Sequence, residues 1–106
     1  MKICLPIVKP EINSEISPVF GRAPYFLVFD LEKEKFKIIK NENSIERGAG
    51  IRSAERIADE EVKVVICDNI GPRALDLLEL SGIKVISEIN GKAKDAIEKF
   101  KKRELA

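Results

Sequence analysis

The sequence predicts an α/β protein in which a mixed sheet of about five strands is covered by about three helices. Two β-rich segments in the first half are joined by a connection of a few residues, which is typical of an antiparallel hairpin. Val64, Val65 and Ile66 form an unbroken β-branched run, typical of a parallel strand buried on both faces. After residue 50, apolar residues recur at helical spacing. The order β-β-β-α-β-α-β-α therefore predicts a sheet that is antiparallel early and parallel late.

The first strand is predicted at residues 3–8. Pro6 has no amide hydrogen, so strand pairing on one side should lapse near it. Polar residues 9–17 predict a loop, and the two prolines and one glycine of residues 17–24 predict a shaped turn.

A hairpin follows that turn, with strands at residues 25–30 and 36–40 and a charged connection between them. Residues 41–50 contain turn-forming residues and two glycines with little periodicity, which predicts a mobile loop. From Gly50 the period becomes helical, and one face carries the apolar residues Ile51, Ala54, Ile57 and Ala58.

A second helix follows the central strand, with Gly82 suited to its C-terminal cap; its apolar residues are Ala74, Leu75, Leu77 and Leu78. Residues 83–86 predict a short strand. Asn90 is predicted to cap a last helix, in which Ala93, Ala96, Ile97 and Phe100 recur at spacings of three and four.

Length and composition limit the possible classes of function. The 106 residues fit one domain, residues 1–106, and the 19 basic and 18 acidic residues give a net charge of +1. This balance predicts neither a nucleic-acid partner nor an anionic membrane surface. No window approaches the roughly 20 apolar residues of a membrane helix, so we expect a cytoplasmic protein. Abundant Lys, Glu and Ile favour a thermophilic source.

Residues 69–72, Asn-Ile-Gly-Pro, follow the central strand and carry helix-start chemistry. Gly71 is predicted to take an unusual backbone angle at the turn, and Pro72 fits the first helical position, where its missing amide hydrogen costs nothing. Open α/β sheets place ligands at the carboxyl ends of their strands. We therefore expect a ligand near this turn, although a plain turn that caps its helix would have the same sequence.

Two other turns contain candidate binding residues. Gly48-Ala49-Gly50 leads into a helix and can present backbone amides to an anion, or it can be a flexible loop without such a role. Arg22 can hold an anion bidentately, or lie on the surface stacked on Tyr25 or paired with a glutamate. Phe20 can close the end of the core or serve as a binding platform.

Catalysis is not expected from this sequence. The chain has no histidine, so serine-histidine and histidine acid-base chemistry lack their parts. Asp30 and Asp68 come at predicted strand ends, but a two-metal carboxylate site needs several acidic groups at one point. Cys4 and Cys67 are expected to be buried free thiols, since no Cys-x-x-Cys motif occurs.

Three segments, residues 17–23, 48–55 and 69–74, the last followed by 81–85, together resemble the dinitrogenase iron-molybdenum cofactor biosynthesis family. The resemblance extends over nearly the whole chain in order and spacing. It implies a ribonuclease H-like three-layer fold with strand order 3-2-1-4-5. It also implies that the protein binds or carries an iron-sulfur or iron-molybdenum cluster, or its precursor, and that its partners are metallocofactor assembly proteins.

The resemblance also implies a binding surface made of three turns. Its residues are Phe20, Gly21, Arg22, Gly48, Ala49, Gly50, Asn69, Ile70, Gly71 and Pro72. Family members often have a histidine at the position of Val19. Because this chain has none, Cys67 is the candidate thiolate ligand to a metal, and a homodimer or a partner could supply further ligands to an otherwise monomeric protein.

These observations lead to a hypothesis of a non-catalytic carrier for a metallocluster. Two alternatives stay open. The chain could be a module that binds a small anion or a phosphometabolite without a metal. It could also be an assembly adaptor that acts through protein contacts alone.

Overall fold

The computed structural model describes residues 1–45 and 47–105. Its strands are β1 (Lys2–Ile7), β2 (Tyr25–Asp30), β3 (Lys35–Lys40), β4 (Val64–Ile66) and β5 (Lys84–Ile86). Its helices are the 3-10 turn η1 (Phe20–Arg22), α1 (Ala49–Ala58), α2 (Pro72–Leu80) and α3 (Ala93–Lys101). Within the described residues the strands form one sheet in the order β3-β2-β1-β4-β5, which confirms the predicted order.

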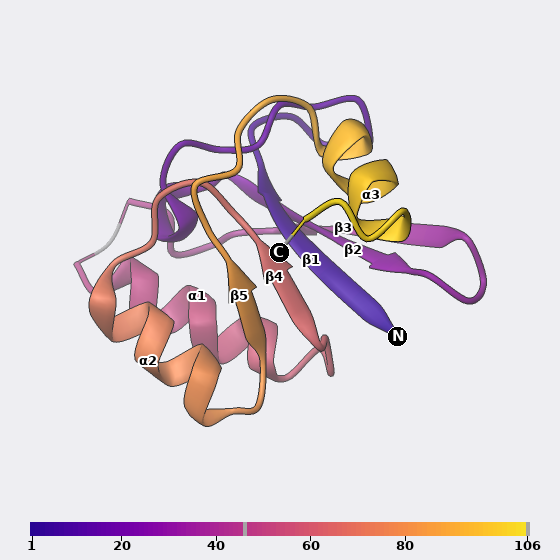
Figure 1. Ribbon diagram of the computed structural model, residues 1–106. Helices are drawn as coiled ribbons and strands as arrows, with labels where there is room; N and C mark the ends of the chain where they lie inside the picture. The colour runs from indigo at the N-terminus through magenta and orange to yellow at the C-terminus, as the bar shows by residue number, and fades with distance from the viewer. Residues whose placement is uncertain (46, 106) are drawn as a thin grey trace.

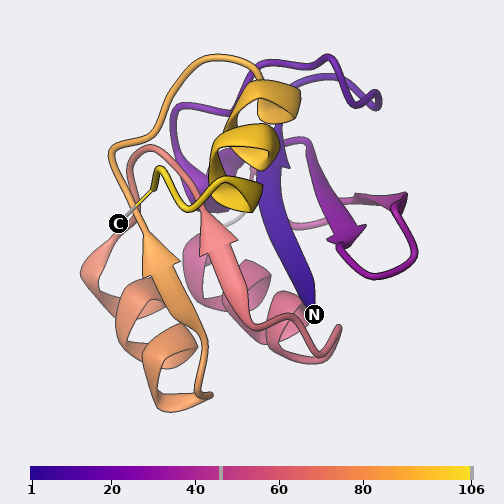
Figure 2. The same cartoon turned by 45° about the vertical axis from the view of Figure 1, so that its right-hand side comes forward.

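The sheet is the middle layer of three. Helices α1 and α2 cover one face and α3 covers the other, as Figure 1 shows and the turned view of Figure 2 repeats. Two apolar clusters fill the spaces between the layers, one that includes Phe26, Ala54 and Leu78 and one that includes Leu5 and Ile97. The three-layer arrangement expected from the sequence is therefore confirmed.

Strand β1 lies at the centre because both of its faces are apolar. Cys4 belongs to the cluster under α1 and α2, while Leu5 belongs to the cluster under α3. Pairing with β2 continues to the end of the strand, but pairing with β4 ends at the Cys4–Val65 pair. Beyond it, the carbonyl oxygen of Pro6 accepts a 2.8 Å hydrogen bond from the Ser17 amide. The predicted lapse of pairing near Pro6 is confirmed.

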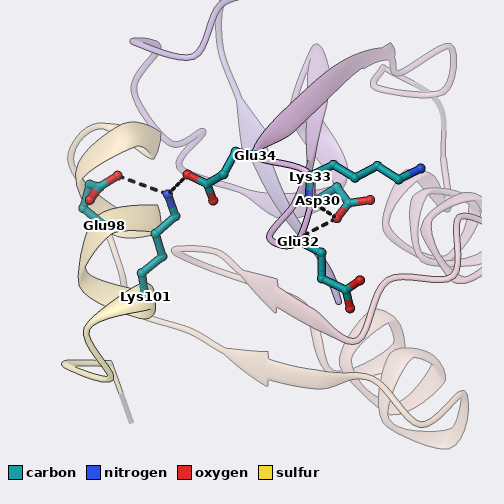
Figure 3. Close-up of polar contacts among 6 residues, drawn as sticks. All are labelled: Asp30, Glu32, Lys33, Glu34, Glu98 and Lys101. Atoms are coloured by element: carbon teal, nitrogen blue, oxygen red, sulfur yellow. Dashed lines mark hydrogen bonds and ion pairs between the residues drawn. The ribbon is translucent and has the colours of Figure 1, made fainter.

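The β2–β3 hairpin is antiparallel, from the Tyr25–Lys40 pair to the Asp30–Lys35 pair. Its turn is closed by the Asp30 carboxylate, which accepts hydrogen bonds of 3.0 Å and 3.1 Å from the amides of Glu32 and Lys33 (Figure 3). These bonds stabilise the ionised carboxylate and lower the pKa of Asp30. The Asp30 side chain thus stabilises the turn between β2 and β3, a role that aspartate often has in turns.

Two predictions about helix starts were wrong. Gly71 has φ −71° and ψ 155°, which is ordinary extended backbone, although α2 does begin at Pro72 as expected. Asn90 does not cap α3, whose N-cap residue is Lys92. The chain turns at Gly91, where φ is +93°, and the carbonyl of Gly91 accepts a 2.8 Å bond from the Ile16 amide, so the helix begins later.

The ends of the other elements follow the sequence closely. Gly82 has φ +80° after α2, and the Ile83 amide bonds to the carbonyl of Leu78 at 3.0 Å, which confirms the glycine cap. The predicted loop of residues 41–50 ends at Gly48, because α1 begins at Ala49. Glu46 falls in this loop and lies outside the described residues. No helix in the described ranges is long and apolar enough to cross a membrane.

Candidate functional site

A cleft of about 350 Å³ opens where η1 meets the first turns of α1 and α2. Three segments line it: Val19 with Gly21 and Arg22, residues 48–51, and residues 71–74. They come from distant parts of the chain, yet the sheet order brings them to the same end of the molecule. This is the region that the sequence predicted as a binding surface.

The cleft has a positive electrostatic character. The charged side chains in its lining are Arg22 and Arg73, and none of the described lining residues is acidic. The N-termini of α1 and α2 both open into it, with Gly48 and Gly71 at the N-cap positions and no side-chain cap on either helix. The first amides of a helix have no partner within the helix and carry a partial positive charge. The arrangement is suited to an anion.

Close packing of two glycines brings η1 against α1. A Cβ atom on Gly21 would lie 2.5 Å from Cα and 2.6 Å from the amide nitrogen of Gly50. Real Cβ atoms do not approach backbone this closely, so position 21 requires glycine for reasons of space. A Cβ on Gly50 would meet the Cβ of Ala74 at an ordinary 3.6 Å. The contact therefore constrains Gly21 much more than Gly50.

Asn69 joins η1 to the turn before α2. Its side-chain Nδ2 and its backbone amide donate to the carbonyl of Pro18 at 2.8 Å and 3.1 Å. Its own carbonyl accepts a 2.9 Å bond from the Phe20 amide. Since its side chain already bonds to Pro18, Asn69 holds the cleft together and does not line it.

Arg22 is exposed, and its Nη1 donates a 3.2 Å hydrogen bond to the carbonyl of Ser44. Among the residues that the structure describes, Arg22 neither stacks on Tyr25 nor pairs with a glutamate, the two surface roles that the sequence left open. Arg73 was not among the predicted site residues, although it directly follows Pro72 in the motif of residues 69–74 that carries the family resemblance. The signal that could have identified Arg73 is its position in the first turn of α2, whose N-terminus opens into the cleft.

Seven of the predicted binding residues line the cleft: Gly21, Arg22, Gly48, Ala49, Gly50, Gly71 and Pro72. Phe20, Asn69 and Ile70 do not. Phe20 is fully buried, with its ring 5.2 Å from that of Phe26, so it closes the end of the core. Ile70 packs against the same apolar cluster. The predicted turns are thus brought together, but some of their side chains point into the protein.

Both cysteines are fully buried, and neither lines the cleft. Burial raises the pKa of the Cys67 thiol to about 12, with a smaller contribution from Asp68. Burial likewise raises the pKa of Cys4, with Cys67 adding to the effect. In the described part of the chain, no group of three or more His, Cys, Asp or Glu residues could hold a metal ion. Ligation by Cys67 stays a prediction, and among the described residues it belongs to no group of three or more such ligands.

Asn41 is a residue of the site region that the sequence did not indicate. It lies directly after β3, and its side chain is bonded to η1 and to α1. An asparagine in a turn-rich segment is read as a turn residue, so no local signal could have shown this role.

The fold and this cleft define a class of small α/β proteins with a cleft at one end of a mixed five-stranded sheet. The chain belongs to the family described as dinitrogenase iron-molybdenum cofactor, whose model matches residues 1–103. The resemblance identified in the sequence is thereby confirmed, and the family connects the chain with a metallocofactor.

The chain is also similar to individual proteins. It is 38% identical over 92 residues to an uncharacterized protein of Methanocaldococcus jannaschii, which covers 80% of this chain and 72% of that protein. The apo form of the orange protein from Desulfovibrio gigas superposes with a TM-score of 0.93 at 27% identity, covering 99% and 90% of the two chains. A NifB-like protein from Thermotoga gives 0.83 at 27% identity, covering 95% and 87%. These structures share the fold.

Proposed function

We propose that this protein is a carrier that binds an anionic metallocluster of the iron-sulfur or iron-molybdenum type, or its precursor, in the cleft. The observation that carries the proposal is the meeting of two helix N-termini and two arginines in a lining without a described carboxylate. Family membership supports a cluster over other anions. The similar orange protein was solved in an apo form, which fits a protein that also has a loaded form.

The lining favours binding through hydrogen bonds and charge over binding through metal-ligand bonds. It offers the guanidinium groups of Arg22 and Arg73 and backbone amides of the helix starts, but no thiol or imidazole among its described residues. Such donors can bond the sulfur or oxygen atoms at the surface of a cluster. A cargo held in this way can be passed on without breaking a metal–ligand bond to the protein, because only hydrogen bonds and charge contacts are released.

The same lining supports a role without catalysis. The described residues in it include no side chain that could exchange a proton near neutral pH or act as a nucleophile. We infer that chemistry on the cargo belongs to other metallocofactor assembly proteins, which would donate the cluster to this chain and receive it afterwards.

Anaerobic incubation of the purified protein with ferrous iron and sulfide, with and without molybdate, tests the proposal. We expect broad visible absorption and stoichiometric metal that survive desalting. Arg22→Ala and Arg73→Ala should each lower retention about tenfold, the loss of one charge-assisted hydrogen bond. Lys94→Ala also removes one positive charge, but from an exposed position on α3, across the sheet from α1 and α2, so it should bind as the wild type does.

Colourless, metal-free protein under all these conditions would reject the carrier proposal. Cys67→Ser separates the two modes of binding. Retention of the cluster in Cys67→Ser would support binding by arginines and amides, whereas its loss would support the predicted thiolate ligand, which would then have to leave the core.

A small-anion module is the second candidate, because the donors of the cleft also suit phosphate. Titration with inorganic phosphate distinguishes it. Micromolar phosphate binding by a protein that takes up no metal would favour this second function.

A further inference from the structure

Asn41 is one of the few buried polar residues among those described, with 8% of its surface exposed. Its Nδ2 donates to the carbonyls of Gly21 and Ala23 at 3.3 Å and 2.8 Å, and to Oγ of Ser53 at 3.2 Å. Gly21 lies in η1, Ala23 is the C-cap residue of η1, and Ser53 lies on the buried face of α1. One side chain thus connects the two sides of the Gly21–Gly50 contact.

The Gly21–Gly50 contact needs such a connection. Two glycines bury almost no apolar surface against each other, so their approach gains little hydrophobic or dispersion energy. The buried Phe20 side chain anchors the first residue of η1 in the core, and hydrogen bonds hold the rest of the turn against α1. Asn69 supplies them on the side of α2, and Asn41 supplies them on the side of β3 and α1.

Two further hydrogen bonds connect Asn41 and η1 to the segment of residues 43–44 that follows Asn41. The Oδ1 atom of Asn41 accepts a 3.1 Å bond from the Asn43 amide, which shapes the turn that carries Ser44. The Ser44 carbonyl in turn accepts the bond from the Arg22 guanidinium. Asn41 holds the backbone of the turn that contains Arg22, and it also places the carbonyl that orients the Arg22 side chain.

We propose that Asn41 is a positioning residue of the cleft, which sets both the place and the direction of the Arg22 guanidinium. The proposal rests on the carrier function above, and it names a residue that contacts no cargo itself. A short side-chain amide suits this role because it combines two N–H donors with an acceptor. An aspartate would instead direct a carboxylate oxygen at the two carbonyl oxygens, and an alanine would remove the Asn41 donor from both.

Asn41→Ala and Asn41→Asp test the proposal, with Ser14→Ala as the matched control. Ser14 is also a buried polar residue, and its hydroxyl bonds to the backbone of Val8, Lys9 and Glu15, away from the cleft. All three variants should lose stability. If Asn41→Ala does not fold, Asn41→Ser, which keeps a hydroxyl donor, takes its place.

The first measurement uses the cargo-free protein. NMR spectra of Asn41→Ala should show shifted amide signals at Gly21 and Gly50 and faster motion of the Arg22 side chain, none of which Ser14→Ala should produce. Wild-type signals at these positions would overturn the proposal. Because no cluster is present, this result is independent of whether the carrier function is correct.

The second measurement is retention of the iron-sulfide cargo. Asn41→Ala should lower it about tenfold, and the double variant with Arg22→Ala should be no weaker than Arg22→Ala alone, because both changes act through one guanidinium. Additive losses, or a loss equal to that of Ser14→Ala, would overturn the proposal. If the wild type itself retains nothing, the carrier function fails, and the NMR measurement alone decides the role of Asn41.

Discussion

Gly21 and Gly50 are in backbone contact, so close that a single added carbon on Gly21 would lie 2.5 Å from the Cα of Gly50. This contact makes a 3-10 turn and a helix start neighbours at the cleft. It explains in physical terms why glycine stands within the Phe-Gly-Arg turn. Because Arg22 directly follows Gly21, the contact between Gly21 and Gly50 also places Arg22 at the cleft.

Gly21→Ala should be the most harmful glycine substitution around the cleft. The new methyl group must displace the backbone of α1 or η1, which costs about 1–3 kcal/mol of unfolding free energy, as for other overpacked sites. Urea denaturation measures the loss. Gly71→Ala is the control, because a Cβ there meets nothing within 4 Å and the backbone is extended. It should cost less than about 1 kcal/mol, the difference between glycine and alanine at an N-cap. Equal losses would contradict the steric explanation.

The two thiols should be unreactive in the folded protein. Burial raises the pKa of Cys67 to about 12 and also raises the pKa of Cys4, so almost no thiolate exists near neutral pH. We expect a thiol reagent at pH 8 to modify both cysteines at once in denaturant, but only at the rate of unfolding in buffer. Rapid modification of Cys67 in buffer would show that it reaches the surface, as a metal ligand would have to do.

Glu60 should make the protein less stable in acid. Side-chain bonds with Lys37 and Arg56 lower the pKa of Glu60 below its ordinary value of 4.5. The stabilisation is therefore complete above that value and is lost as the pH falls through the lower pKa of the folded protein. Unfolding free energies measured from pH 6 downward should fall less steeply for Glu60→Gln than for the wild type. Glu55→Gln, an exposed residue on α1, is the matched control, and the same change of slope in both variants would reject the assignment.

Lys101 joins α3 to the β2–β3 hairpin. Its Nζ lies 2.7 Å from Oε1 of Glu34 and 3.5 Å from Oε1 of Glu98, and 5.0 Å from the centre of the Phe29 ring (Figure 3 shows the two glutamates). Lys101→Met should lower the melting temperature slightly, more than Lys102→Met and less than Gly21→Ala. Because exposed ion pairs are screened, the difference between the two lysine variants should shrink in about 1 M salt. A difference that salt leaves unchanged would indicate packing instead of charge.

Much of the fold could be predicted from the sequence because the signals are local. The spacing of apolar residues determined the hairpin and the three helices, and Pro72 and Gly82 marked the start and end of α2. The residues of the cleft were predicted as segments, since each turn carries glycine next to a helix or strand end. Where the local signal was weak, as at Asn90, the prediction failed, because contacts with residues 14–16 decided where α3 begins.

The sequence by itself therefore determined which residues form strands, helices and turns, and which family the chain belongs to. Only the tertiary structure decided which side of each turn faces the cleft: Arg22 and Arg73 toward it, Phe20 and Cys67 into the core. It alone showed that Asn41 and Asn69 hold these turns together. The physical reason is that periodicity acts within a few residues, whereas hydrogen bonds and close backbone contacts between distant segments exist only after the sheet has brought those segments together.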